Sequence, residues 1–192
     1  MMKIVLASSS PRRRQLLEWA ELEFDILSRE TPETYPVGMS WEEIPVYIAR
    51  QKALVVQGLD LYKRYEAGTP ILAADTIVVL NGKILGKPES KEEAVKMLTA
   101  LSGKKHEVIT GVVLLSDAKE ISFYDITEVE FHPVDPEDIR YYVDKYIPLD
   151  KAGAYAIQEW IGVIGIKSVK GDFYNVMGLP VSRVLRALRD HF

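Results

Sequence analysis

The ten-residue run at positions 71–80 constrains the fold more than any other part of the chain. It is mostly apolar and rich in β-branched residues, Asp75 is its only charged residue, and Asn81-Gly82 follows it. Such a run predicts a central strand, and Asn-Gly predicts a hairpin that returns the chain as a second strand. A lone ionised carboxylate buried in a strand costs roughly several kcal/mol. Asp75 therefore predicts a compensating lysine, divalent ion or cleft, or, as the alternative, backbone amides at a strand end.

Helical and strand patterns alternate through the rest of the chain. Ser10-Pro11 predicts a helix start, and Ser40 and Ser90 each begin capping-box spacings with a glutamate three residues later. We expect strands at 3–7, 71–80, 106–115 and 121–131, helices starting near 11, 40, 91, 136 and 180, and a turn entering a strand at 171–175. Both hairpins and helical crossovers join these strands, so the fold class is α/β with a mixed sheet. Residues 1–192 fit one domain, which can fold as two lobes around a cleft.

Composition excludes several classes of protein. The chain has no cysteine, which excludes disulfides, thiolate metal sites and a cysteine nucleophile. Its net charge of −4 provides no basic field for a nucleic-acid partner. The apolar stretch at residues 4–7 is too short for a signal peptide or membrane span, so a cytoplasmic protein without a membrane partner is expected. The three histidines show no zinc-binding spacing, and no Gly-x-Ser-x-Gly elbow occurs.

A serine-rich turn, Ser8 to Ser10, comes directly before the first predicted helix. The free N–H groups and dipole of a helix N-terminus favour a phosphate. Arg12 and Arg13 stand in that first turn, where acidic residues would suit the dipole better. A bound polyanion would resolve this conflict, while a solvated basic helix face explains it equally well.

Two lysines complete a candidate phosphate site. Lys52 falls towards the apolar face of the helix that begins near residue 40, and Lys87 stands between Gly86 and Pro88. Lys52 could extend along its apolar surroundings to solvent, and Lys87 could be an ordinary loop residue. Several cations and one isolated carboxylate near predicted strand ends nevertheless fit a triphosphate.

The segment 150–158 places glycine and small residues among polar groups and ends at Gln158. Small residues let a backbone come close to a ligand. The Gln158 amide offers one donor and one acceptor, which complement the O4 and N3–H edge of uracil or thymine. A glutamine that caps a helix or is satisfied in the core is the competing interpretation.

These residues resemble the Maf family of nucleotide pyrophosphatases over nearly the whole chain. The matching segments are LASSSPRR at 6–13, AADTIV at 73–78, GKP at 86–88, DKAGAYAIQ at 150–158 and NVMGLP at 175–180. The resemblance implies a fold similar to that of inosine triphosphate pyrophosphatases, with an elongated mixed sheet flanked by helices. It further implies attack of water on the α-phosphate with Mg²⁺ or Mn²⁺ as cofactor.

The resemblance also implies roles for individual residues. Asp75 matches the general base, and Glu33 matches an acidic position that helps to hold the metal. The positions that match phosphate-handling residues are Ser8, Arg12, Arg13, Lys52 and Lys87. Arg12, Thr76 and Gln158 resemble the set of the dTTP/UTP branch rather than the methyl-GTP branch, and a homodimer is suggested.

The resulting hypothesis is an enzyme that hydrolyses nucleoside triphosphates, preferentially dTTP and UTP, to monophosphate and pyrophosphate, and so cleans nucleotide pools. Two rivals remain at this point. One is a pyrophosphatase for 7-methyl-GTP or other modified nucleotides, and the other is a non-catalytic nucleotide-binding regulator of septum formation.

Overall fold

A computed structural model describes residues 3–117 and 119–192, and it is a mixed α/β fold. The strands are β1 (Ile4–Leu6), β2 (Phe24–Ile26), β3 (Ile71–Leu80), β4 (Lys83–Leu85), β5 (Lys105–Leu115), β6 (Glu120–Phe131) and β7 (Ile166–Lys170). The helices are α1 (Pro11–Trp19), α2 (Glu43–Gln57), η1 (Tyr62–Arg64), α3 (Lys91–Leu101), α4 (Pro136–Tyr146), η2 (Ala152–Ala154), α5 (Trp160–Gly165), α6 (Phe173–Met177) and α7 (Val181–His191). In the described part of the chain, no helix has the length and apolarity needed to cross a membrane.

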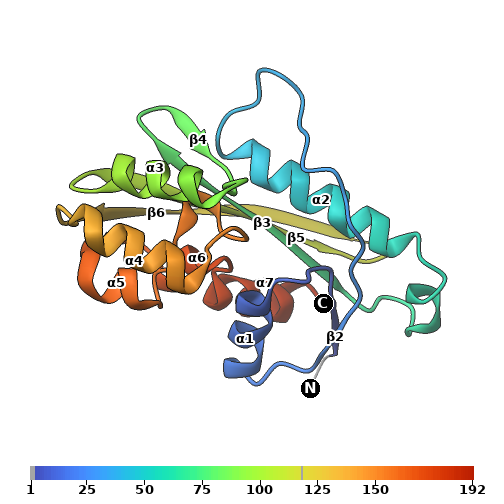
Figure 1. Ribbon diagram of the computed structural model, residues 1–192. Helices are drawn as coiled ribbons and strands as arrows, with labels where there is room; N and C mark the ends of the chain where they lie inside the picture. The colour runs from blue at the N-terminus through green and yellow to red at the C-terminus, as the bar shows by residue number, and fades with distance from the viewer. Residues whose placement is uncertain (1–2, 118) are drawn as a thin grey trace. The chain divides into compact units, whose positions relative to one another are not determined.

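The seven strands form one sheet in the order β2-β1-β3-β5-β6-β7, with β4 paired to β3 (Figure 1). Strand β1 pairs in parallel with both β2 and β3, whereas β3–β4 and β6–β7 pair antiparallel. The β3–β4 connection is the expected Asn81-Gly82 turn, in which both residues have positive φ, at 50° and 71°. The predicted mixed sheet flanked by helices is confirmed.

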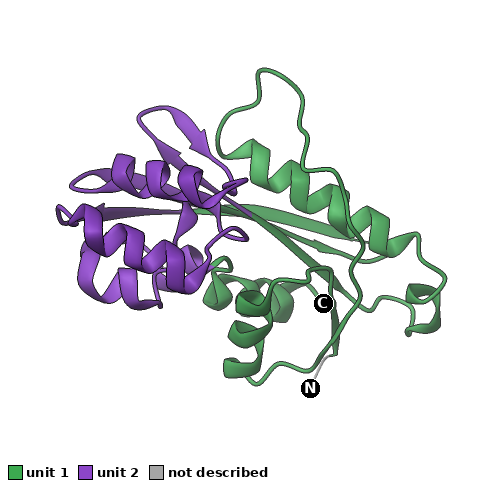
Figure 2. Cartoon of the chain, in the orientation of Figure 1, with its two compact units in different colours: residues 1–75, 110–125, 178–192 green, residues 76–109, 126–177 purple. Residues whose placement is uncertain are grey.

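The chain forms two compact units, which Figure 2 shows in green and purple. Unit 1 comprises residues 1–75, 110–125 and 178–192, and unit 2 comprises residues 76–109 and 126–177. Strands β3, β5 and β6 each contribute residues to both units. The expectation of one domain over residues 1–192 stays a prediction.

The core of unit 1 is formed where α2 packs on the sheet. Small residues of α2, Ala49 and Ala53, lie among apolar side chains of β1, β3 and β5. Ile71 and Ala73 belong to this core, and strand alternation places Asp75 on the same face of β3. The packing of α2 on β3 thus puts a carboxylate under a helix.

Two of the three predicted serine caps, Ser10 and Ser90, are the N-caps of α1 and α3, whereas α2 begins at Glu43, three residues after Ser40. Ser10 is the N-cap of α1 and Pro11 its first residue. Ser40 Oγ accepts from the Glu43 N–H at 3.3 Å while Glu43 Oε2 accepts from the Ser40 N–H at 2.8 Å, which completes a capping box. Ser90 Oγ likewise accepts from the Glu93 N–H at 3.2 Å.

The turn-to-strand prediction at residues 171–175 was wrong. The chain there enters the short helix α6. Asp172 Oδ1 accepts from the N–H groups of Tyr174 at 2.7 Å and Asn175 at 3.3 Å. These bonds satisfy free amides at a helix start, so the aspartate acts as a helix cap rather than as a turn residue before a strand.

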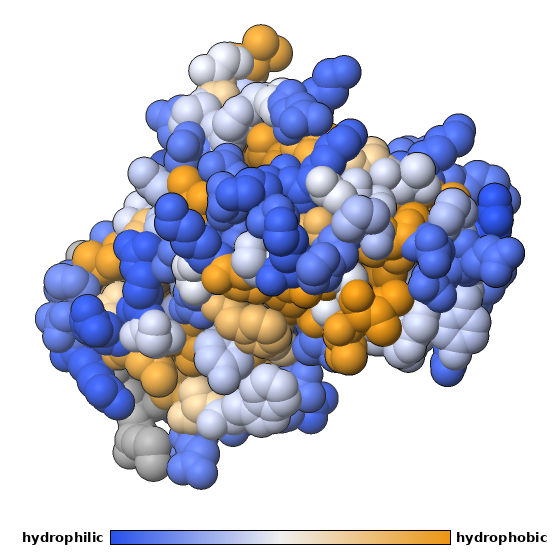
Figure 3. All heavy atoms as spheres, turned by 90° about the vertical axis from the view of Figure 1, so that its left-hand side faces the viewer, coloured by the Kyte–Doolittle hydropathy of each residue, from blue (hydrophilic) through white to orange (hydrophobic). Residues whose placement is uncertain are grey.

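Helix α5 packs through glycines. A Cβ added to Gly162 would lie 1.8 Å from the Ile157 carbonyl oxygen, and one added to Gly165 would lie 3.0 Å from the Phe131 ring. The helix backbone therefore lies directly against its neighbours, while Val163 on its other side is exposed. On the face of the molecule in Figure 3, apolar side chains form separate patches among hydrophilic ones.

Ile147 ends helix α4 in a strained conformation. Its φ of 46° and ψ of 64° are left-handed, a region that β-branched residues seldom adopt, and its side chain is exposed. We expect Ile147→Gly to raise the free energy of unfolding by about 1 kcal/mol, because relief of strain outweighs the entropy that glycine adds to the unfolded chain. Thermal unfolding measures the change. Ile147→Ala is the control, since it keeps the Cβ, and equal stability of the two variants would contradict the strain argument.

His106 is buried in unit 2, where its Nε2 lies 2.7 Å from the Tyr155 hydroxyl and its ring stacks on Phe131. Burial lowers the pKa of His106 from 6.5 to about 4. Between these pH values the unfolded chain binds more protons, so stability contributed by neutral His106 is lost as the pH falls from 6.5 towards 4. That contribution amounts to about 3 kcal/mol for this shift.

We therefore expect His106→Gln to flatten the rise in unfolding free energy between pH 4 and 7. Urea unfolding at several pH values gives the difference between the natural chain and the variant. His132→Gln, at an exposed histidine, is the control for the loss of a histidine as such. If the unfolding free energy of His106→Gln still rises with pH as steeply as that of the natural chain, the pH dependence comes from other groups.

Candidate active site

An aspartate and a lysine meet where α2 covers β3. Lys52 Nζ lies 2.6 Å from Asp75 Oδ1, and the two side chains are only 16% and 10% exposed. Lys52 reaches this position because it lies on the face of α2 that also contains buried Ile48. The lysine that Asp75 required as a compensating charge is thus found, and it is the predicted site residue Lys52.

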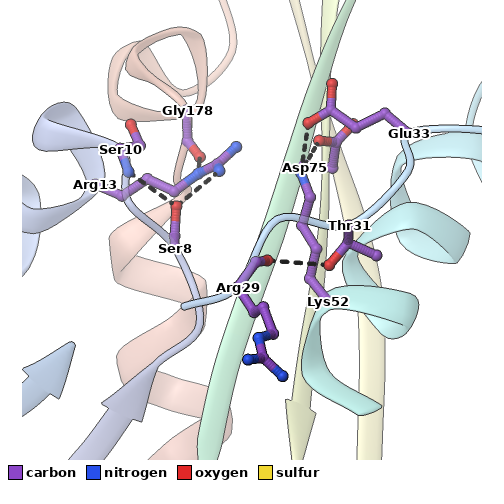
Figure 4. Close-up of polar contacts among 9 residues, drawn as sticks. All are labelled: Ser8, Ser10, Arg13, Arg29, Thr31, Glu33, Lys52, Asp75 and Gly178. Atoms are coloured by element: carbon purple, nitrogen blue, oxygen red, sulfur yellow. Dashed lines mark hydrogen bonds and ion pairs between the residues drawn. The ribbon is translucent and has the colours of Figure 1, made fainter. Parts of the chain in front are cut away.

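Glu33 joins the same lysine from the loop between β2 and α2 (Figure 4). Lys52 Nζ lies 2.8 Å from Glu33 Oε1, so one ammonium bridges two carboxylates. Two residues earlier, the Thr31 hydroxyl donates to the Arg29 carbonyl at 3.1 Å, which shapes the loop that presents Glu33. We call Lys52, Glu33 and Asp75 the carboxylate cluster.

Burial raises the pKa of Asp75 above its ordinary value. Lys52 and Arg13 oppose this effect by favouring the carboxylate, and Glu33 adds to it by repulsion. Desolvation outweighs the two cations. A carboxylate with a raised pKa is a better proton acceptor than an ordinary aspartate, which suits a general base.

Arg13 holds the serine-rich turn in place. The guanidinium donates from Nε to the Gly178 carbonyl at 2.8 Å and from one terminal nitrogen to Ser8 Oγ at 3.2 Å (Figure 4). Ser8 Oγ also accepts from the Ser10 N–H at 3.2 Å. Arg13 is buried and electrostatically attracted to Asp75, so the solvated-face interpretation was wrong for this residue. Arg12, beside it, is half-buried.

The remaining predicted residues, Thr76, Lys87 and Gln158, belong to unit 2. Strand alternation directs Thr76 to the face of β3 opposite to Asp75, the face that it shares with Val78. A Cβ added to Gly153 would lie 3.1 Å from Val78, so the segment 150–158 packs on that face. Thr76 therefore faces the side of β3 that carries the segment ending at Gln158.

The residue before Lys87, Gly86, is hydrogen-bonded to the segment 150–158. The Gly153 N–H donates to the Gly86 carbonyl at 3.0 Å. Lys87 and Gln158 are both exposed, unlike Lys52. Within unit 2, the loop containing Lys87 and the segment ending at Gln158 are thus joined by a backbone hydrogen bond.

The carboxylate cluster has the donors that a magnesium-type ion uses. Two carboxylate oxygens already flank one cation, the ammonium of Lys52. Mg²⁺ is commonly held by one or two carboxylates together with water and substrate phosphates. Across the described residues, no group of three or more His, Cys, Asp or Glu side chains could hold a metal ion. Glu33 and Asp75 therefore offer two carboxylates to such an ion, which would need further ligands from other groups.

Gly178 is a part of the site that sequence reasoning missed. Its carbonyl accepts from Arg13 although the two residues are 165 positions apart. Its φ of 114° is accessible mainly to glycine, and this allows the chain to turn before α7. The segment NVMGLP that contains Gly178 was the available signal, but no chemistry was assigned to it.

Fold and site together define an α/β protein in which a buried aspartate is paired with a lysine and attracted to an arginine at a helix start. The sequence model of the protein family described as "Maf-like protein" matches residues 3–191 of this chain. The chain therefore belongs to the Maf family.

Two curated relatives, both named dTTP/UTP pyrophosphatase, are similar to this chain over nearly its whole length. A Cytophaga hutchinsonii protein named dTTP/UTP pyrophosphatase is 51% identical over 98% of this chain and 84% of its own length. One with the same name from Bacteroides thetaiotaomicron is 49% identical over 97% of this chain and 95% of its own. The Staphylococcus aureus Ham1 protein superposes with a TM-score of 0.44 and 16% identity over 67% of this chain and 71% of that chain.

Proposed function

We propose that this protein hydrolyses nucleoside triphosphates, preferentially dTTP and UTP, to the monophosphate and pyrophosphate. The observation that carries the proposal is the buried Asp75 held by Lys52 and attracted to Arg13, in a member of the Maf family. The names of the relatives supply the nucleotides, since dTTP/UTP pyrophosphatases are 49% and 51% identical to this chain. The corresponding role of the protein is to remove nucleoside triphosphates from the nucleotide pool.

In the proposed reaction, Asp75 accepts a proton from a water molecule that attacks the α-phosphorus. The bond between this phosphorus and the oxygen that bridges to the β-phosphorus breaks, and pyrophosphate leaves with that oxygen. The groups that neutralise or orient the phosphates are Ser8, Arg12, Arg13, Lys52 and Lys87. Cations in a low-dielectric site stabilise the charge that develops on the leaving group.

A divalent ion, Mg²⁺ or Mn²⁺, would be held by Glu33 next to Asp75. Bound there, it would supply charge neutralisation for the phosphate oxygens and lower the pKa of water. Glu33 is half-exposed in its ion pair with Lys52, with 42% of the side chain accessible, so it can change partners without leaving a buried charge. Removal of the metal with EDTA should abolish turnover.

Thr76 and Gln158 are the proposed base-reading residues. An amide donates and accepts at once, and therefore complements the O4 and N3–H edge of a pyrimidine. Gln158→Glu replaces the donor with an acceptor and should lower kcat/KM for dTTP and UTP about tenfold, with a smaller effect on purine triphosphates.

The test is product analysis by anion-exchange chromatography after incubation with Mg²⁺ and canonical and modified triphosphates. We expect dTMP or UMP together with pyrophosphate. Turnover of 7-methyl-GTP in preference to dTTP would contradict the proposed substrate preference. Tight nucleotide binding without turnover would contradict the proposal that the protein is an enzyme. A nucleotide preference that Gln158→Glu leaves unchanged would remove Gln158 from base reading.

We place the activity in the cytoplasm because the proposed substrates belong to its nucleotide pool. The homodimer stays a prediction that size-exclusion chromatography with light scattering can test.

A further inference from the structure

The loop that presents Gln158 is held on both sides by one buried phenol. Tyr142 of α4 is 0% exposed. Its hydroxyl donates to Glu159 Oε2 and accepts from the Ala156 N–H at 3.3 Å. Ala156 lies two residues before Gln158 and Glu159 one residue after it. A single hydroxyl therefore binds the backbone amide of Ala156 before an exposed glutamine and the carboxylate of Glu159 after it.

The Glu159 end of this arrangement is extended by a buried lysine. Lys151 Nζ lies 3.6 Å from Glu159 Oε1 and 2.7 Å from Asp150 Oδ1. The side chain of Lys151 is 9% exposed and that of Glu159 is 24% exposed. A carboxylate that receives a phenol hydrogen bond and also faces an ammonium has little rotational freedom.

The peptide between Ile157 and Gln158, the two residues between these anchors, is also constrained by helix α5. A Cβ on Gly162 would lie 1.8 Å from the Ile157 carbonyl oxygen and 2.6 Å from the Ile157 carbonyl carbon. The first turn of α5 thus lies directly against the peptide that precedes Gln158. Because Gln158 itself is exposed, its position is set by its neighbours rather than by its own packing.

We propose that Tyr142 is a positioning residue for nucleotide specificity, which aims the Gln158 amide by tying Ala156 and Glu159 to one hydroxyl. The inference rests on the proposed role of Gln158 in reading the base. A hydrogen-bonding group discriminates between bases only when its position is fixed, because a mobile amide can satisfy different edges. Burial raises the pKa of Tyr142, so the phenol stays protonated and remains a donor.

The first variant is Tyr142→Phe, which removes the hydroxyl and keeps the ring. We expect KM for dTTP and UTP to rise about tenfold, the equivalent of one hydrogen bond, while kcat changes less than about twofold. Kinetics with a purine triphosphate should change little, because Asp75 and Lys52 are untouched. A merely structural role would lower turnover of all nucleotides together, so the split between KM and kcat and between bases separates the two explanations.

Tyr141→Phe is a matched control on the same helix. The Tyr141 hydroxyl accepts from Lys145 Nζ at 2.7 Å, and its ring contacts Trp160, a contact that phenylalanine keeps. This tyrosine is exposed, so its variant should behave as the natural chain. Should Tyr142→Phe fail to fold, Glu159→Ala removes the acceptor of the same hydroxyl from a half-buried position and should raise KM for pyrimidines in the same way.

Gln158→Ala and the double variant Gln158→Ala/Tyr142→Phe complete the experiment. The proposal requires that Gln158→Ala lowers the pyrimidine preference and that Tyr142→Phe adds nothing in its presence. If Gln158→Ala lowers the preference but Tyr142→Phe does not, the positioning role is overturned while base reading by Gln158 stands. If Gln158→Ala leaves the preference unchanged, the proposed base reading itself fails, and the role of Tyr142 fails with it.

Discussion

Asp75→Asn is expected to lower kcat/KM for dTTP about a thousandfold, because an amide cannot accept the proton of the attacking water. The substitution keeps the size of the side chain and its position on β3. It also removes a charge whose burial is unfavourable, as the raised pKa of Asp75 shows, so the variant should remain folded. Nucleotide binding should persist, since the phosphate-handling cations are retained.

The matched control for this prediction is Asp25→Asn. Asp25 is also a strand residue paired with a lysine, at 2.8 Å from Lys3 Nζ, but 41% of its side chain is exposed and it lies outside the carboxylate cluster. Initial rates with dTTP, measured alongside circular dichroism, compare the two variants. Undiminished turnover in Asp75→Asn would exclude Asp75 as the base, and an equal loss in Asp25→Asn would indicate a general effect of lost charge.

The fold was predictable where local signals were strong. The run at 71–80, with Asn81-Gly82 after it, defined β3 and its turn without reference to the rest of the chain. Serine caps with glutamate three residues later defined α2 and α3 in the same way. These signals depend on neighbouring residues alone, and the structure confirmed them.

The short strands β2 and β7 were not predicted, because both contain polar residues (FDI and IKSVK), unlike the equally short but wholly apolar β1 (IVL). A segment of that length has no clear periodicity, and its strand conformation comes from pairing with β1 or β6. Pro148 predicts the end of the helix that begins at Pro136, and α4 ends at Tyr146. The left-handed conformation of Ile147 was not predicted, because it contradicts the preference of isoleucine. In these segments tertiary structure overrides local preference.

For the site, the sequence predicted the identity of the candidate residues better than the contacts between them. An isolated Asp75 required a partner, but the pairing with Lys52 crosses 23 positions and depends on α2 packing over β3. Glu33 was named only through family resemblance, because nothing in its loop indicates that it lies near the same lysine. Tyr142 resembled an ordinary core residue until its hydroxyl was found between Ala156 and Glu159.

The packing that creates the carboxylate cluster depends on one glycine in β5. A Cβ added to Gly111 would lie 2.2 Å from the Val46 amide nitrogen and 2.3 Å from the Pro45 carbonyl carbon. These are backbone atoms in the first turn of α2, so no side-chain rotation can relieve the overlap. The helix can lie this close to the sheet only because position 111 lacks a side chain.

Gly111→Ala should therefore lower the free energy of unfolding by about 3 kcal/mol or more, with a fall in Tm of about 10 °C for a chain of this size. Gly86→Ala is the matched control, because no atom lies within 4 Å of its added Cβ. Thermal unfolding of both variants gives the comparison. Since α2 carries Lys52, we also expect Gly111→Ala to lose activity at a lower temperature than the natural chain. Equal Tm values for the two variants would show that α2 can move away from β5 at little cost.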